Sequence, residues 1–357
     1  MQSIHQYIDS LPDDVEIINI SGRGLTEIPD LSRFKNLRKL YCYDNKLTSL
    51  PPLNFYLEEL FCANNNLSRL PELNFYLKKI YCANNKLTCL PEFNYHLQRI
   101  HCFNNLLTYL PELNYHLQEL DCSSNKLKHL PQLNNHLQAL FCSGNNLTSL
   151  PQLNYDLKKI YCAYNDLTYL PDLNKNLEKL FCQCNYLTYL PKLNENLKEL
   201  FCYNNGLTFL PVLNRNLQRL HCSGNKLRFL PILNEELKKL YCNENQLTCL
   251  PDLNEKLELI EYYKNPIYEI LSNNNYVNNI FNEIKNDELN ILKQKVKRFN
   301  NFIHLYHCLK FKRPLRKWLW ELVREPRIIT KYHPSYLLEN LSETDDLDEF
   351  LEYWVAT

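Results

Sequence analysis

The chain has 357 residues, of which 45% are hydrophobic, and its 40 basic residues balance its 40 acidic residues. This balance gives no electrostatic reason to expect a nucleic-acid or membrane partner for the chain as a whole. No apolar run approaches the roughly 18 residues that a membrane span needs, and the start MQSIHQYIDSLPDD lacks the pattern of a secretory signal. The 15 cysteines would leave one unpaired in a secreted chain. We therefore expect a cytoplasmic protein.

Residues 1–14 are predicted to form an N-terminal cap. Ile4, Ile8 and Leu11 fit one short amphipathic turn that can cover the first coil of the repeat that follows, because the ends of a repeat array need a cap. The segment is too short to be an independent domain.

A 20-residue repeat then runs through the segment 15–270. Between Leu37 and Lys256 the chain consists of eleven consecutive copies of L-x-x-[LI]-x-C-x-x-N-x-L-x-x-L-P-x-[LF]-N-x-x. Weaker copies around Ile18 and Ile260 flank these, which makes about thirteen coils. A single copy cannot bury its own apolar residues, so the stability must come from the stacking of neighbouring copies.

This pattern resembles a leucine-rich repeat, and its length is similar to that of the short repeats of bacterial effector proteins. The resemblance implies an α/β repeat solenoid with short parallel strands on a concave face and an extended or 3₁₀ convex side. The residues support this independently, because each copy starts with apolar strand residues such as Leu57, Leu60 and Cys62. Asn45 and its equivalents are expected to bond backbone groups where the chain leaves the strand. Pro51 and its equivalents suit an extended segment.

Eleven cysteines share one repeat position, from Cys42 to Cys242. A free cysteine behaves as a small buried hydrophobe, and neighbouring strands hold Cβ atoms about 4.8 Å apart, more than the roughly 3.8 Å that a disulfide favours. We therefore predict buried free thiols, no metal and no cofactor. Cys182 and Cys184 form a C-x-C pair, but no further ligand motif lies nearby, so we assign no zinc site.

His96, His116 and His136 share another position and should form a ladder on the convex side, at a spacing that could admit a metal ion. The same position also accepts Tyr56 and Asp156. A solvated surface stack is therefore the favoured interpretation, and metal binding by the three histidines stays open.

The candidate functional site is the concave face. The outward strand position next to each repeat cysteine carries Phe or Tyr in eight of eleven copies, and the position two residues earlier carries seven basic and three acidic residues. Rings on a pleated surface either cover the sheet by cross-strand stacking or form contact sites for a protein or peptide, with charges steering the partner. We favour the second interpretation. The predicted partner-binding residues are Tyr81, Arg99, Phe141, Lys159, Tyr161, Lys179, Phe181, Phe201 and Tyr241.

Aromatic residues allow two further interpretations. A second aromatic stripe, from Tyr109 to Phe229, either covers the side of the solenoid or forms another contact edge for a partner. Rings beside Lys and Arg can also stack single-stranded nucleic acid, but Glu59, Glu119, Asp121 and Glu199 interrupt the concave stripe and would repel phosphate. We therefore do not expect a nucleic-acid partner. The second stripe comprises Tyr109, Tyr169, Tyr189, Phe209 and Phe229.

Residues 271–357 are predicted to form a helical module. Apolar residues at three- and four-residue spacing predict a helix from about Glu288 to Leu309, and the later pieces LRKWLWELVR and LDEFLEYWV also read as helices. A basic stretch from Lys310 to Lys331 and an acidic stretch from Glu339 to Glu352 either neutralise each other or offer a second partner a charged surface. The string FKRPLRKWLWELVREPRIITKYHPSYLLENL resembles a C-terminal segment of proteins of giant amoeba-infecting DNA viruses. That resemblance implies a viral protein acting in the host cytoplasm.

The sequence favours a protein that is not an enzyme. It has no Ser-His-Asp order, HExxH, P-loop or GxGxxG motif, and it has only five glycines for a phosphate loop. Some effector-type repeat proteins carry a ubiquitin ligase domain with a catalytic Cys-x-Asp, but here Cys308 is followed by Leu309 and Lys310. We predict a non-catalytic protein-binding solenoid. The alternative is a substrate-recognition subunit or a ubiquitin ligase-type effector.

Overall fold

The computed structural model describes residues 4–271 and 286–310. The described residues divide into two units, of which the first ends at Val296. The later helical pieces, the three tryptophans and the two charged stretches predicted from the sequence lie outside the described residues. Within the part that is described, no helix is both long and apolar enough to cross a membrane.

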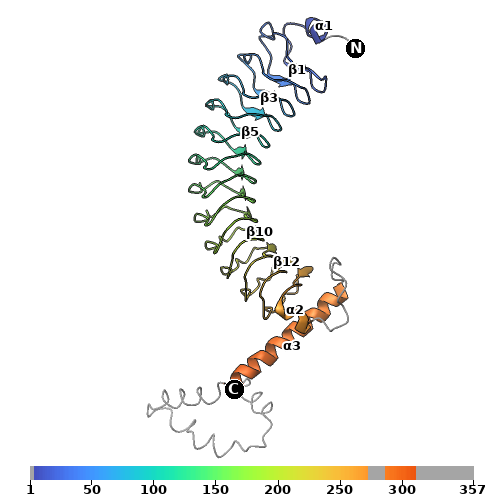
Figure 1. Cartoon of the computed structure of the whole chain (residues 1–357), viewed down its shortest axis with the longest axis vertical. Coiled ribbons are helices and arrows are strands. Elements are labelled where there is room, and N and C mark those ends of the chain that lie inside the picture. The colour runs from blue at the N-terminus through green and yellow to red at the C-terminus, as the bar shows by residue number, and fades with distance from the viewer. Residues whose placement is uncertain (1–3, 272–285, 311–357) are drawn as a thin grey trace, which may run out of the picture. The chain divides into compact units, whose positions relative to one another are not determined.

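The repeat folds as a solenoid whose thirteen short strands form one parallel sheet in chain order (Figure 1). From β2 onward each strand pairs with the next in a register of 20 residues, as Lys39 does with Glu59. The predicted solenoid and its coil number are confirmed. The strands are β1 (Ile17–Asn19), β2 (Lys39–Tyr41), β3 (Glu59–Phe61), β4 (Lys79–Tyr81), β5 (Arg99–His101), β6 (Glu119–Asp121), β7 (Ala139–Phe141), β8 (Lys159–Tyr161), β9 (Lys179–Phe181), β10 (Glu199–Phe201), β11 (Arg219–His221), β12 (Lys239–Tyr241) and β13 (Leu259–Glu261).

Besides the strands, the described residues form three helices: α1 (Ile4–Asp9), α2 (Pro266–Leu271) and α3 (Asn286–Lys310). In α1, Ile8 is buried, and the Arg33 guanidinium donates to the Ile8 carbonyl at 2.6 Å, which ties this helix to the first coil. Helix α3 confirms the helix predicted after the repeat. Its first turns bury Leu292 and Val296.

Each coil buries the apolar residues that the repeat pattern selects. In the coil of β3, Leu60, Cys62 and Leu67 are fully buried. The return path between strands has no regular secondary structure and includes a turn shortly before each strand. It contains no 3₁₀ segment within the described repeats, so the predicted 3₁₀ form of the convex side is not found there.

One residue per coil, two positions after the repeat cysteine, adopts a left-handed conformation. This residue is Gly144 at φ 67° in one coil, but it is Asn84 at 54° and Tyr164 at 53° in others. Asn tolerates this region better than other non-glycine residues. The Asn84 side chain also donates to Asn64 Oδ1 at 2.6 Å, so neighbouring turns are hydrogen-bonded to each other.

The repeat asparagine ties neighbouring coils together. Asn145 Nδ2 donates to the carbonyls of Cys142 at 3.1 Å and Cys122 at 3.0 Å, and its Oδ1 accepts from the Leu127 N–H at 3.0 Å. Equivalent bonds recur along the solenoid to Asn265. The predicted role of this residue at the strand end is confirmed, and the bonds to the preceding coil extend it.

A second asparagine ladder runs along the turn before each strand. Asn154 Nδ2 donates to the Leu137 carbonyl at 2.9 Å and the Asn135 carbonyl at 3.2 Å. Its Oδ1 atom is buried and has no hydrogen-bond partner. This ladder, from Asn54 to Asn254, therefore satisfies fewer buried groups per residue than the first.

The repeat cysteines are free and buried, as predicted. Burial raises the pKa of Cys82 and of Cys162 to about 12, so these thiols stay protonated. Cys182 is buried as well, whereas Cys184, Cys89 and Cys249 are only half-buried.

Replacing Asn145 by alanine should lower the free energy of unfolding by about 3 kcal/mol or more, because each buried backbone group left without a partner costs about 1–3 kcal/mol. Urea unfolding followed by circular dichroism measures the loss. Asn154→Ala, in the second ladder, should cost less, at about 1 kcal/mol. The exposed neighbour Asn146 gives the matched control, and an Asn146→Ala loss as large as that of Asn145→Ala would contradict the assignment.

Thiol labelling should separate two classes of cysteine in the native protein. A maleimide at pH 8 should modify Cys89, Cys184 and Cys249 well before the eleven repeat cysteines, because burial blocks access and keeps those thiols protonated. Peptide mass spectrometry after timed quenching assigns each site, and protein unfolded in guanidinium provides the fully reactive reference. Fast modification of Cys122 or Cys142 would show that the coil register is wrong.

Candidate functional site

The strands present two columns of side chains on one face of the solenoid, which we call the sheet face. In β8 the middle residue Ile160 is buried, while Lys159 and Tyr161 point outward, because side chains alternate along a strand. The 20-residue register places equivalent residues side by side. We call the third strand positions the ring column and the first strand positions the charged column.

Four predicted site residues form one continuous stack in the ring column. The ring centroids of Phe141 and Tyr161 are 4.8 Å apart, those of Tyr161 and Phe181 4.3 Å, and those of Phe181 and Phe201 4.4 Å. The last two pairs are nearly parallel, at 9° and 12°. Each of these rings is half-buried, because its neighbours cover its faces and leave its edge open.

The other two predicted rings lie apart from this stack. Tyr81 ends a shorter stack in which its ring lies 4.6 Å from Phe61, and it then meets His101 at an angle of 73°. Asp121 occupies the next position and separates the two stacks. Tyr241 lies beyond His221, with ring centroids 4.8 Å apart. The predicted contact rings therefore do not form one continuous stack.

The charged column is largely paired within itself. Glu59 contacts Lys79 at 3.0 Å and Lys39 at 3.6 Å. Glu199 repeats this bridging, at 2.8 Å from Lys179 and 3.9 Å from Arg219. Glu119 instead contacts two residues of β5, Arg99 at 3.7 Å and His101 at 3.2 Å.

This pairing distinguishes the three predicted basic residues. Arg99 and Lys179 are held by glutamates of the next strand, and hydrogen bonding to Glu199 raises the pKa of Lys179. Lys159 is exposed and has no carboxylate partner among the residues that the structure describes. It stands beside the four-ring stack and is therefore the cation most available to a partner.

Comparison with known proteins gives matches among solved structures alone. No protein-family model and no curated protein matches the chain. The structure of YopM, a leucine-rich effector protein from Yersinia pestis, is 31% identical with a TM-score of 0.64, over 70% of this chain and 78% of that chain. This chain belongs to the leucine-rich repeat proteins.

Two further structures are similar to this leucine-rich repeat protein. The functional domain of InlJ from Listeria monocytogenes, which includes a cysteine ladder, is 25% identical with a TM-score of 0.53, over 70% of this chain and 63% of that chain. The leucine-rich repeat domain of APL1B is 23% identical with a TM-score of 0.61, over 71% of this chain and 82% of that chain. The second likeness concerns the fold alone.

The predicted histidine ladder of this leucine-rich repeat protein lies in the turns before the strands and is enclosed by aromatic rings. Phe75 meets His96, Tyr95 meets His116 and Tyr115 meets His136, each with centroids 4.6 Å apart and rings nearly perpendicular. No group of three or more potential metal-ligating side chains is found among the described residues.

The rings that contact these histidines from the preceding turn, Phe75, Tyr95 and Tyr115, were not predicted from the sequence. The same comparison of equivalent repeat positions that identified the ring column would have found them. All five rings of the second predicted aromatic stripe, from Tyr109 to Phe229, are exposed.

His221 lies in the ring column between Phe201 and Tyr241, and Tyr203 contacts it at 4.3 Å. Burial lowers the pKa of His221 to about 4, which favours its uncharged form in the folded protein. The unfolded chain therefore binds a proton between about pH 6.5 and pH 4 that the folded protein does not. The contribution of His221 to stability falls as the pH decreases through this range.

Replacing His221 by phenylalanine should remove this acid sensitivity. The free energy of unfolding of the variant minus that of the wild type should be about 1 kcal/mol larger at pH 5 than at pH 7.5, after discounting for the partial exposure of His221. Urea unfolding at both pH values measures it. His221→Gln, which also cannot titrate but lacks the ring, should show the same pH-dependent gain at lower overall stability. A pH dependence unchanged in both variants would refute the assignment.

Proposed function

We propose that this leucine-rich repeat protein is a non-catalytic scaffold that captures a protein or peptide partner on its sheet face. The observation that carries the proposal is the four-ring stack from Phe141 to Phe201. Beside it stands Lys159, which has no carboxylate partner in the described part of the chain. Aromatic residues supply a large share of the energy at protein interfaces, and a neighbouring charge steers and orients the partner.

The stack supports binding because its rings are already ordered. A side chain that is free in solution loses rotamer entropy when a partner immobilises it, and stacked rings have lost that freedom beforehand. The strands below them are fixed by ladder hydrogen bonds on both sides. The ring edges are therefore presented by a rigid support, as a preorganised binding surface requires.

The charged column supports a division of tasks. Lys159 can meet a carboxylate of the partner directly. Arg99 and Lys179 have Glu119 and Glu199 as intramolecular partners, so a docking carboxylate must compete with these. We propose that Arg99 and Lys179 define the orientation of the partner and that Lys159 provides the attraction. Tyr81 and Tyr241 would form the outer contacts.

We further propose that the protein is host-directed and acts in the cytoplasm of a host cell. The similar YopM structure is that of an effector protein, and the C-terminal string resembles segments of giant-virus proteins. The segment 271–357 would then bind a second partner.

Replacing Phe141, Tyr161 and Phe181 together by serine should weaken partner binding at least tenfold, because it removes the centre of the stack. The partner is first identified by affinity purification with mass spectrometry, and the dissociation constant is then measured with the purified partner by calorimetry. Thermal unfolding should remain cooperative, since these rings are only half-buried.

The matched control replaces three exposed rings of the second stripe, Tyr109, Tyr169 and Tyr189, by serine. This variant should bind the partner like the wild type. Undiminished binding by the first variant, or an equal loss in the control, would count against the sheet face as the binding site.

A further inference from the structure

A second ring-bearing surface lies along the turns that precede the strands in the first half of the solenoid. We call it the turn wall. The proposed function does not use it, since it lies beside the sheet face and not on it. Its members are Phe55, Tyr56, Phe75, Tyr76, Tyr95, His96, Tyr115, His116 and His136.

In the turn wall, the ring at the first turn position lies nearly perpendicular to the ring that follows it and to the equivalent ring of the next turn. Tyr95 contacts His96 of its own turn at 5.4 Å and His116 of the next turn at 4.6 Å, at angles of 84° and 90°. Phe75 repeats this arrangement with Tyr76 at 5.3 Å and His96 at 4.6 Å. Each turn is thus coupled to the next through its rings.

The wall has an inner and an outer row. The inner rings are partly covered by the outer rings, whereas Phe55, Phe75, Tyr95 and Tyr115 are 54% to 63% exposed. Two of these four outer rings are phenylalanines, which have no polar group to hydrate. A contiguous row of exposed rings is typical of an interaction surface.

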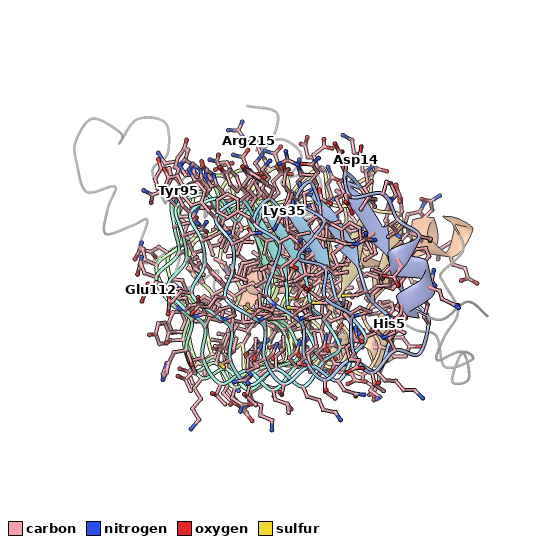
Figure 2. The ribbon with its side chains drawn as sticks, turned by 90° about the horizontal axis from the view of Figure 1, so that it is seen from above. His5, Asp14, Lys35, Tyr95, Glu112 and Arg215 are labelled. Atoms are coloured by element: carbon pink, nitrogen blue, oxygen red, sulfur yellow. The ribbon has the colours of Figure 1, made fainter. Side chains whose placement is uncertain are left out.

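The later coils show that the fold does not need rings at these positions. The coil after the wall still carries a ring, Tyr155, but the following turns carry Lys175, Glu195 and Arg215. Figure 2 shows Tyr95 and Arg215 at the same edge of the solenoid. Arg215 lies 3.5 Å from Glu195, and Asn196 donates to the Lys175 carbonyl at 2.8 Å. Polar turns therefore satisfy the same backbone, so stability alone does not account for the wall.

The chemistry of the wall fits a ligand without formal charge. None of its members is a carboxylate, a lysine or an arginine, and the neighbouring positions carry the amides Gln98 and Gln118. Where charges occur nearby, they are paired, as Glu58 is with Lys78 at 2.7 Å and Arg38 at 3.2 Å. Tyrosine hydroxyls and amides are donors for backbone carbonyls.

We propose that the turn wall binds a proline-rich segment in the polyproline II conformation. Such a segment repeats every three residues, or about 9.3 Å, and leaves its carbonyls unpaired. The exposed outer rings offer apolar faces to the prolines, and the tyrosine hydroxyls and neighbouring amides can donate to the carbonyls that the segment leaves unpaired. Aromatic surfaces bind polyproline II segments in this way because the ligand is already ordered.

Titration of the full chain with the peptide Ac-PPAPPAPPA-NH₂ tests the proposal, with calorimetry or tyrosine fluorescence as the readout. The wild type should bind with a dissociation constant below 1 mM. The triple variant Phe75→Ser, Tyr95→Ser, Tyr115→Ser should bind at least tenfold more weakly. The double variant Tyr95→Phe, Tyr115→Phe keeps the rings and removes two hydrogen-bond donors, so its affinity for the peptide should fall about two- to fivefold. This variant tests the proposal if the triple variant unfolds.

The matched control is the triple variant Lys175→Ser, Glu195→Ser, Arg215→Ser, which changes the same turn position in the polar coils and should bind like the wild type. Replacing Phe141, Tyr161 and Phe181 by serine should also leave peptide binding unchanged, so the turn wall and the sheet face are tested independently. Absence of binding at 1 mM peptide, an equal affinity for the peptide Ac-GSAGSAGSA-NH₂, or undiminished binding by the turn-wall variants would overturn the proposal.

Discussion

The hydrogen bonds of the first asparagine ladder are the interaction on which the remaining structure depends. Each amide joins the strand-end carbonyls of two successive coils and a turn N–H of the preceding coil, as Asn145 does with Cys142, Cys122 and Leu127. These bonds hold neighbouring coils in a register of 20 residues. A slip by one residue would turn the ring column inward and the repeat cysteines outward.

A fixed register converts a sequence repeat into continuous columns. Rings that are 20 residues apart become a stack with centroids 4.3 to 4.8 Å apart, and a single glutamate such as Glu199 reaches basic residues on both neighbouring strands. The same rule acts in the turns, where it couples Tyr95 to His116. Both proposed binding surfaces thus result from the fixed register. They differ in exposure because the stacked rings of the ring column cover each other's faces, whereas the perpendicular rings of the turn wall cover each other less.

The period predicted the strands, the buried thiols and the task of Asn145, because these follow from which positions alternate and which backbone groups need partners. It did not predict the pairing of Arg99 with Glu119 or the low pKa of His221, since both depend on side chains of neighbouring coils. Counting charges along the column gave a positive stripe, whereas the contacts leave Lys159 without a described carboxylate partner. The period predicted the histidine ladder that belongs to the inner row of the turn wall. It did not mark the outer row as exposed, because turn residues do not alternate in direction as strand residues do.

The buried positions hardly change from Cys42 to Cys242, yet both surfaces change near the middle of the array. Asp121 interrupts the ring column, and the continuous turn wall ends at His136. One further turn carries an exposed ring, Tyr155, and the turns from Lys175 onward are polar. Each coil contacts only its neighbours, so the surface of one stretch can differ without disturbing the core of another. The longest sheet-face stack begins at Phe141, directly after the wall ends. The two surfaces therefore occupy successive stretches of one rigid support, which allows two ligands to bind without sharing a coil.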